Sequence, residues 1–580
     1  MNNPLKNRTK TAGLYAASAV NLLIMHYYIL LTCRLENYTD ALLWMDNLLG
    51  VVVDVTCILA VALLLTWGRL RPSLLITAIM TMLWAYSNVL YSRFFHHYIS
   101  LSAMSQTGVL IDGFMLSNIY EGMKWYDLII ILQSAMIGWL FAGAKKEDGF
   151  RKRHLLLTWP VLLMVADLGL HVLFCAVTPG MASPSYFKRR IITRHFGLLH
   201  SSAEPNWSTF HRGTVRQLLI PALHDAFLKT ELTAEQRAAI KAEYSNHEER
   251  VSGARPKVTD KNIIFIIVES YLSATSDLKV DGQEVTPFLN ALKQDSNVYF
   301  NPHLTPNISI GESSDGQFLY MAGMLPLRSE VTVTKAKHAE LPGLPKILKK
   351  EGIISEAQMI IPTLPSMWEQ EAMCQRYGFD HLYSSADYEG GKYWYLSDRQ
   401  IFEYALKEHA AAAAPFLSVI LTMTMHQPYN EPMDTMFTIT KPSLKEKYRN
   451  YLSTSHYTDR QIQCYFEQLK QQGLYDNSII VIVADHHAHA SLFDMADDDI
   501  STDIPLYIVN APIDRNKAWQ GRCQQLDVYT TLLDLLGCQS AWKGLGHTLL
   551  TTDYHDSLRP ELWTLSEQIV TGNYFKTPEP

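Results

Sequence analysis

The stretch Ile263–Ser270, IIFIIVES, decides the fold of the C-terminal half of this chain. Its unbroken apolar run, mostly β-branched, indicates a strand buried on both faces, as in the parallel sheets of α/β domains. Two further runs share this character, and all three end on polar residues: Ile263–Val268 on Glu269, Phe416–Met425 on His426, and Ser478–Ala484 on Asp485 and His486. Because ligands bind at the carboxyl ends of such strands, the sequence predicts an enzyme site there.

Length, charge and cysteine spacing limit the possible classes of protein. The chain has 580 residues, which is too long for one ordinary domain, so we expect two or three units. Its formal net charge of -7 argues against nucleic acid as a partner. The 7 cysteines include no CxxC pair, which excludes a zinc ribbon. Cys523 and Cys538 leave two alternatives open, a disulfide in an exported domain or two buried free thiols.

The N-terminal part is dominated by apolar segments that approach or reach the length of a membrane-spanning helix, about 20 residues. Five such segments cover roughly residues 12–32, 47–67, 73–92, 127–144 and 155–178. The first is not a cleaved signal peptide, because four more follow it and no small-residue cleavage site closes it. The sequence therefore predicts a multi-pass, five-helix transmembrane anchor.

Basic side chains set the expected orientation of this anchor. They gather before the first span and in the loops after the second and fourth spans, whereas the intervening loops carry few. Under the positive-inside rule, the N-terminus is cytoplasmic and everything after residue 178 lies outside. We expect a protein of the bacterial cytoplasmic (inner) membrane with an extracytoplasmic catalytic domain. The residues that set the orientation are Lys6, Arg8, Lys10, Arg69, Arg71, Lys145, Lys146, Arg151, Lys152 and Arg153.

The expected domain organisation follows from these patterns. Residues 1–178 form the anchor, 179–256 a juxtamembrane linker, 257–556 the catalytic domain and 557–580 a C-terminal tail. From residue 257 strand and helix patterns alternate, with one helix expected at 286–295, which predicts an α/β domain with a mostly parallel sheet.

Ser313 lies in a glycine-flanked turn, Gly311–Gly316, just before a helical pattern. Backbone N–H groups and the helix dipole at such a place stabilise an anion, although a serine there is more often an ordinary helix cap. Together with Glu269, Asp485 and His486 it makes a set of oxygen ligands with one nitrogen and no sulfur. Such a set suits one divalent metal such as Mn²⁺, Mg²⁺ or Zn²⁺. A metal-bound serine is also an activated nucleophile.

At this point the motifs resemble a known family. IIFIIVES with Glu269, GESSDGQF with Ser313, LTMTMHQPY with His426 and IIVIVADHH with Asp485 and His486 occur in the order typical of the lipoteichoic acid synthase branch of the alkaline phosphatase/sulfatase superfamily. These are membrane-anchored phosphoglycerol transferases, with phosphoethanolamine transferases as relatives. The resemblance extends over essentially the whole chain and includes the segment SMWEQEAMCQRYGFD around Trp368.

The resemblance implies roles for individual residues. Glu269, Ser313, Asp485 and His486 would ligate the metal, for which Mn²⁺ or Zn²⁺ is favoured over Mg²⁺, and Ser313 stands where the family usually has a threonine nucleophile. His426 would lie beside the substrate phosphate, and Trp368 would line the pocket. This chain departs from the pattern at Gln370, where the family's phosphoglycerol-binding arginine is expected, and Arg328 is a candidate to replace that charge.

The leading hypothesis is a phosphotransferase. Ser313 attacks the headgroup phosphate of a membrane phospholipid, phosphatidylglycerol or phosphatidylethanolamine, and the phosphoserine is passed to a glycan or lipid acceptor. The alternatives are a phosphodiesterase that uses water as acceptor and a non-catalytic protein that binds lipid or glycan. His487, His489 and His547 raise the further alternative of a second metal, against that of second-shell or solvated groups.

Overall fold

The computed structural model separates the chain into two compact units, Met1–Lys229 and Thr230–Pro580, which are described one at a time. The residues whose structure is described are 4–32, 51, 54–56, 58–67, 69–95, 123–142, 231–245, 250–251, 255–309, 311–328, 331–393, 395–427, 429, 437–441, 444–488, 492 and 501–576.

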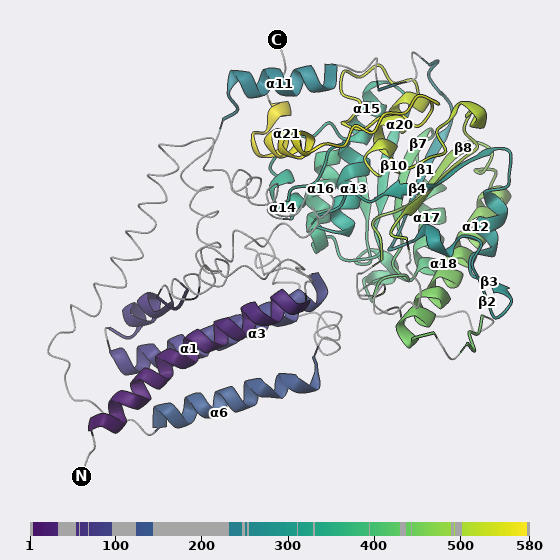
Figure 1. Ribbon diagram of the computed structural model, residues 1–580. Helices are drawn as coiled ribbons and strands as arrows, with labels where there is room; N and C mark the ends of the chain where they lie inside the picture. The colour runs from purple at the N-terminus through teal and green to yellow at the C-terminus, as the bar shows by residue number, and fades with distance from the viewer. Residues whose placement is uncertain are drawn as a thin grey trace. The chain divides into compact units, whose positions relative to one another are not determined.

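The first unit consists of helices in its described part (Figure 1). Helix α1 (Pro4–Thr32) packs along α3 (Leu70–Phe95), and α6 (Ile129–Ala142) packs against both. By length and composition, the stretch Leu70–Arg93 is sufficient to cross a membrane. The expected span at 155–178 lies outside the described residues. The described segments Ala12–Met25, Asp54–Leu65 and Trp125–Phe141 are apolar but shorter.

The second unit is built on an eight-stranded sheet with the order β10-β4-β9-β8-β1-β7-β5-β6. Strand β9 runs antiparallel to its neighbours β8 and β4, and the other pairs are parallel, which confirms the expected mostly parallel α/β fold. The strands are β1 (Asn262–Val268), β4 (Val298–Thr305), β5 (Glu356–Ile360), β6 (His381–Tyr383), β7 (Phe416–Leu421), β8 (Ser478–Ala484), β9 (Ile504–Val509) and β10 (Cys523–Gln524), with a separate hairpin of β2 (Lys279–Val280) and β3 (Gln283–Glu284).

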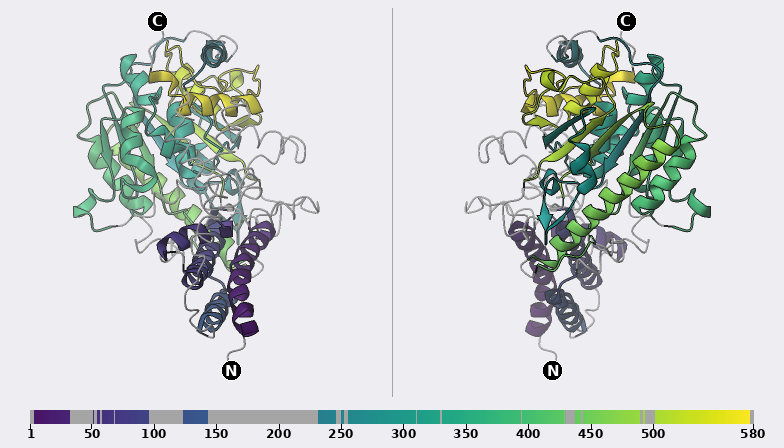
Figure 2. Two further views of the ribbon diagram at one scale, coloured as in Figure 1. Left: turned by 90° about the vertical axis from the view of Figure 1, so that its left-hand side faces the viewer. Right: turned by 90° about the vertical axis from the view of Figure 1, so that its right-hand side faces the viewer.

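Helices cover both faces of this sheet. One layer contains α12 (Pro287–Leu292), α17 (Asp398–His409) and the long α18 (Glu446–Gln471), which lies in front of the sheet in the right-hand view of Figure 2. The other contains α13 (Ser313–Ala322), α14 (Thr332–Ala336), α15 (Leu344–Lys350), α16 (Gln370–Tyr377) and α20 (Asp527–Leu535).

Strand β1 shows why the apolar runs are continuous. Phe265 contacts Tyr320 of α13, with ring centroids 5.4 Å apart. Its neighbour Ile264 faces the opposite side of the sheet. It pairs with Ser418 of β7, whose hydroxyl lies 2.9 Å from His409 of α17 on that side. Successive side chains of a strand alternate between faces, so a strand covered by helices on both sides needs apolar residues throughout.

Strands β1 and β8 have nearly the bounds expected from the sequence, but β7 is shorter. The apolar run continues to Met425, whereas the strand ends at Leu421. Asp398 Oδ1 accepts the backbone N–H groups of Met423 and Thr424 at 2.8 and 2.9 Å, which turns the chain out of the sheet before His426. The expectation that His426 directly ends a strand is therefore wrong.

The boundaries of the second unit are wider than the expected catalytic domain at both ends. Helix α11 (Ala234–Ser245) buries Ile240 and Tyr244, and α21 (Pro560–Thr571) buries Leu562 and Ile569 in the same core. Residues that the sequence patterns assign to the linker and the tail thus complete this core. Cys523 and Cys538 are buried free thiols.

Candidate metal and nucleophile site

The polar residues that end β1 and β8 meet at one edge of the sheet. The two strands pair in parallel with Val268 beside Ala484, so Glu269 and Asp485-His486 emerge side by side. The ligand atoms of these three buried residues all lie within 4.8 Å of one another. His486 Nε2 is 3.6 Å from Glu269 Oε1 and 3.3 Å from Asp485 Oδ2. Among the residues that the structure describes, this is the one group of three such side chains arranged to hold a metal.

The orientation of His486 suits a metal ligand. Its Nδ1 lies 2.6 Å from the carbonyl oxygen of His487, which can only accept a hydrogen bond, so Nδ1 carries hydrogen and Nε2 faces the carboxylates. Metal-binding histidines usually donate their second ring N–H in this way. Burial lowers the pKa of His486, but the Asp485 and Glu269 carboxylates outweigh this effect and raise it to about 9. A bound cation would take the place of the Nε2 proton.

The charge balance of the site also favours a cation. Burial, followed by the nearby Glu269 carboxylate, raises the pKa of Asp485 to about 7. Burial likewise raises the pKa of Glu312, whose carboxyl interacts with His486 and His426. Several carboxyl groups are thus crowded where water cannot solvate their charge, a condition that a divalent cation relieves. The donor set of two carboxylates, an imidazole and a hydroxyl fits such an ion.

Ser313 is the first residue of α13, and its hydroxyl reaches the three ligands. Ser313 Oγ lies 3.1 Å from His486 Nε2 and 3.4 Å from Glu269 Oε2. The neighbouring Ser314 points elsewhere, since its hydroxyl donates to the carbonyl oxygen of Gly311 at 2.8 Å. The geometry therefore distinguishes Ser313 from Ser314 as the hydroxyl that shares the site.

Two features of the motif around Ser313 position the helix. Asp315 Oδ2 accepts the backbone N–H groups of Ser309 and Gly311, both at 2.9 Å, and so closes the loop that enters α13. At Gly316 the helix approaches the end of β8 so closely that an added Cβ would lie 2.2 Å from the Asp485 carbonyl oxygen. A side chain at this position would separate Ser313 from the metal ligands.

His426 follows the turn after β7 and is half-buried. Its Nδ1 lies 2.6 Å from the Gln427 carbonyl oxygen, which can only accept a hydrogen bond, so Nδ1 carries hydrogen. Burial lowers the pKa of His426, and the charges of His486 and Glu312 act on it as well. The structure thus brings His426 into the electrostatic neighbourhood of the predicted ligands.

Trp368 lies in a strained turn just before α16. Trp368 and Glu369 have φ values of 50° and 55°, in the left-handed region that residues other than glycine rarely adopt. The turn leads into α16, where buried Gln370 donates from Nε2 to Gln317 Oε1 at 2.9 Å. Gln317 is one helical turn from Ser313, so the segment after Trp368 packs against α13. Strained backbone of this kind is frequent at functional sites.

The remaining candidates lie apart or have structural contacts. Arg328 packs on α21, where its guanidinium carbon is 4.0 Å from the ring centroid of Trp563. His487 Nδ1 lies 2.8 Å from the Ala488 carbonyl oxygen, and His547 Nδ1 lies 2.9 Å from that of Thr548. His489 is outside the described residues. Sequence reasoning missed Ser270, Glu312 and Asp315, which lie beside predicted site residues in the chain, because their contacts form only when the ends of β1 and β8 meet the start of α13.

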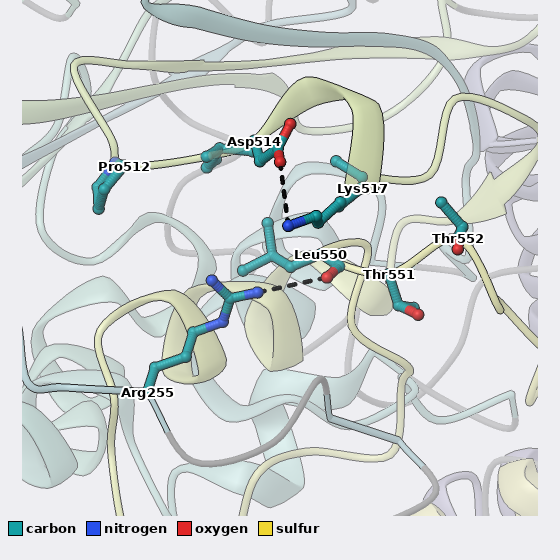
Figure 3. A pocket seen from close by; sticks show the side chains of 9 residues that line it. Arg255, Pro512, Asp514, Lys517, Leu550, Thr551 and Thr552 are labelled. Carbon is teal, nitrogen blue, oxygen red and sulfur yellow. Dashed lines mark hydrogen bonds and ion pairs between the residues drawn. The ribbon is translucent and has the colours of Figure 1, made fainter.

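A cavity of about 470 Å³ lies at the other edge of the sheet (Figure 3). It is lined by the loop that follows β9, whose last residue, Val509, pairs with Ile480 near the start of β8. Both labelled cations have partners: Arg255 donates to the Leu550 carbonyl oxygen at 3.3 Å, and Lys517 lies 3.4 Å from Asp514. The cavity is therefore separate from the candidate site, and its charges are compensated.

Comparisons with known proteins agree with this architecture. Residues 1–202 match the model of the lipoteichoic acid synthase N-terminal domain, and residues 261–538 match the sulfatase family model. Lipoteichoic acid synthase 2 of Bacillus subtilis strain 168 is 27% identical over 479 residues, which are 78% of this chain and 70% of that protein. The lipoteichoic acid synthase of Staphylococcus saprophyticus is 25% identical, over 82% of this chain and 74% of that protein.

Solved structures also resemble the chain. The lipooligosaccharide phosphoethanolamine transferase A of Neisseria meningitidis aligns over 96% of this chain and 98% of its own, with a TM-score of 0.49 and 14% identity. The sulfatase family model covers the segments where the motifs and the candidate site lie, and the N-terminal model covers most of the first unit. The chain thus carries a region that matches the lipoteichoic acid synthase N-terminal domain and a region that matches the sulfatase family, and it is similar in sequence to lipoteichoic acid synthases.

Proposed function

We propose that this protein is a membrane-anchored, metal-dependent phosphotransferase. It moves a phospholipid headgroup phosphate, phosphoglycerol or phosphoethanolamine, to a glycan or lipid acceptor of the cell envelope. The observation that carries the proposal is the position of Ser313 Oγ, 3.1 Å from His486 Nε2 and 3.4 Å from Glu269 Oε2 at the start of α13. The similarity to lipoteichoic acid synthases supports the same class of reaction.

Glu269, Asp485, His486 and Ser313 would hold the metal, and Mn²⁺ or Zn²⁺ suits the imidazole in this set better than Mg²⁺. When bound, the ion lowers the pKa of the Ser313 hydroxyl and neutralises charge on the phosphate. The N-terminus of α13 adds its dipole and backbone N–H groups to the stabilisation of an anion at the same place.

Ser313 acts as the nucleophile. Its oxygen forms a bond to phosphorus while the bond from phosphorus to the diacylglycerol oxygen breaks, and diacylglycerol leaves with a proton. An acceptor hydroxyl then attacks the phosphoserine ester, which releases Ser313 and gives the new phosphodiester. His426 has Nδ1–H engaged with the Gln427 carbonyl oxygen, so Nε2 is the ring atom that would take up and return a proton beside the phosphate. Trp368 forms part of the headgroup pocket.

The proposed setting is the outer face of the bacterial cytoplasmic membrane. Five spans, at the ranges given by the sequence, would hold the catalytic unit on the side where the donor headgroups are exposed. The described span Leu70–Arg93 supports a membrane location, and the distribution of lysine and arginine supports the orientation. A shared surface brings the lipid donor and Ser313 together without diffusion through solution.

The test is mass spectrometry of envelope lipids and glycans from cells that carry the wild-type protein, the Ser313→Ala variant or neither. We expect an acceptor that bears phosphoglycerol or phosphoethanolamine, together with more diacylglycerol, in wild-type cells alone. The mass of the added group identifies the donor. Identical profiles in the wild-type and Ser313→Ala cells would contradict the proposal.

A further inference from the structure

Ser270 lies between the two carboxylates of the candidate metal site and is hydrogen-bonded to both. Its hydroxyl donates to Glu269 Oε1 at 2.7 Å, and its backbone N–H donates to Asp485 Oδ1 at 2.8 Å. The residue is 3% exposed, so water does not compete for these bonds. One residue thus connects the end of β1 to the end of β8 through the side chains that would bind the cation.

The backbone of Ser270 is held in an unfavourable conformation. Its φ is 52°, in the left-handed region that residues other than glycine rarely adopt. The Tyr451 hydroxyl of α18 donates to the Ser270 carbonyl oxygen at 3.0 Å and accepts the N–H of Leu272 at 3.1 Å. Such strain persists only where the surroundings fix it. Here the conformation aims both the N–H and the hydroxyl at the ligands.

The hydrogen bonds of Ser270 hold one oxygen of each carboxylate in place. Asp485 Oδ1 accepts the N–H groups of Ser270 and His486, which leaves Oδ2 at 3.3 Å from His486 Nε2. Glu269 Oε1 accepts the Ser270 hydroxyl, and Oε2 lies 3.4 Å from Ser313 Oγ. Ser270 thus holds one oxygen of each carboxylate, and the Glu269 oxygen that it holds, Oε1, also lies 3.6 Å from His486 Nε2.

From this arrangement we infer that Ser270 is a positioning residue that orients both carboxylate ligands for the divalent cation. The inference rests on the metal-dependent function proposed above. Hydrogen bonds to ligating carboxylates set their direction, and their removal typically weakens metal binding by about 10–100-fold. Ser270 is hydrogen-bonded to Glu269 and Asp485, so its effect on the cation passes through these two carboxylates.

The experiment measures Mn²⁺ affinity by calorimetry on the full-length chain in detergent, after bound metal has been removed with a chelator. The variants are Ser270→Gly and Ser270→Ala, with Ser273→Ala as the matched control. Glycine adopts the positive φ without strain, so Ser270→Gly removes the hydroxyl and keeps the fold and the backbone N–H. The Ser273 hydroxyl is buried and has no hydrogen-bond partner among the described residues.

We expect the Kd for Mn²⁺ to rise about 10–100-fold in both Ser270 variants. The thermal midpoint of metal-free Ser270→Gly should equal or exceed that of the wild type, and Ser273→Ala should bind as the wild type does. Two results would overturn the inference without affecting the proposed function. One is a wild-type Kd for Mn²⁺ in Ser270→Gly, and the other is an equal rise of the Kd in Ser273→Ala. A wild-type chain that binds no Mn²⁺ and no Zn²⁺ would overturn both.

Discussion

Replacing Gly316 with alanine tests how closely the nucleophile helix must approach the metal ligands. The added Cβ would lie 2.2 Å from the Asp485 carbonyl oxygen and 2.9 Å from its carbonyl carbon. Ordinary contacts between such atoms are about 3.5 Å, so α13 must move away from the end of β8 by about 1 Å. The partner atoms are backbone, which cannot rotate aside as a flexible side chain does. Ser313 moves with the helix, because it lies on the preceding turn.

A displacement of about 1 Å at a reacting group can lower the rate about 100-fold, and overpacking of this kind costs about 1–3 kcal/mol of stability. The assay is headgroup transfer from a labelled phospholipid by the full-length protein in detergent or vesicles, with the thermal midpoint measured in parallel. Gly138→Ala in α6 is the control, because its Cβ meets nothing within 4 Å. If Gly316→Ala keeps more than about a third of wild-type turnover while Gly138→Ala is normal, the close approach of α13 does not govern catalysis.

Three further predictions concern metal, pH and topology. Elemental analysis should find about one divalent ion per wild-type chain and none in Asp485→Ala, because the ion loses one of few protein ligands; two tightly bound ions would contradict the one-metal site. Burial lowers the pKa of His409 to about 3, so the unfolded chain takes up a proton below about pH 6.5 that the folded chain excludes. Between about pH 6.5 and pH 3 the wild type should therefore lose about 1.4 kcal/mol of stability per pH unit relative to His409→Gln, as measured by denaturant midpoints; parallel curves would refute this. A topology reporter in the 145–154 loop should register in the cytoplasm and one after residue 180 outside, and the reverse pattern would overturn the proposed orientation.

The sequence predicts the central strands well, because burial on both faces leaves a direct trace in composition. Strands β1 and β8 lie within a residue of the apolar runs that predict them. The end of β7 could not be predicted in this way, since it depends on Asp398, more than twenty residues earlier in the chain, which accepts the N–H groups of Met423 and Thr424. Apolar composition indicates where a strand can form, and such distant contacts determine where it ends.

The candidate site divides in the same way. Glu269, Asp485 and His486 could be predicted as metal ligands from the sequence. Each follows the carboxyl end of a predicted buried strand, where ligands bind in parallel sheets. Their distances depend on the register that sets Val268 beside Ala484, which no local pattern encodes. The positions of Ser270 and Gly316 follow from that register too. Ser270 directly follows Glu269, and Gly316 lies three residues after Ser313, yet their roles are visible only once the ends of β1 and β8 and the start of α13 are together.

The covalent step is the central claim, and one measurement tests it directly. The full-length protein is incubated with Mn²⁺ and a labelled phosphatidylglycerol or phosphatidylethanolamine analogue, quenched in acid and digested, and the peptide that contains residues 311–317 is analysed by mass spectrometry. We predict a phosphoester of the donor headgroup on Ser313 that is absent from Ser313→Ala, while Ser313→Thr keeps part of the transfer activity. An adduct on Ser309 or Ser314, or near-wild-type transfer by Ser313→Ala, would contradict the account.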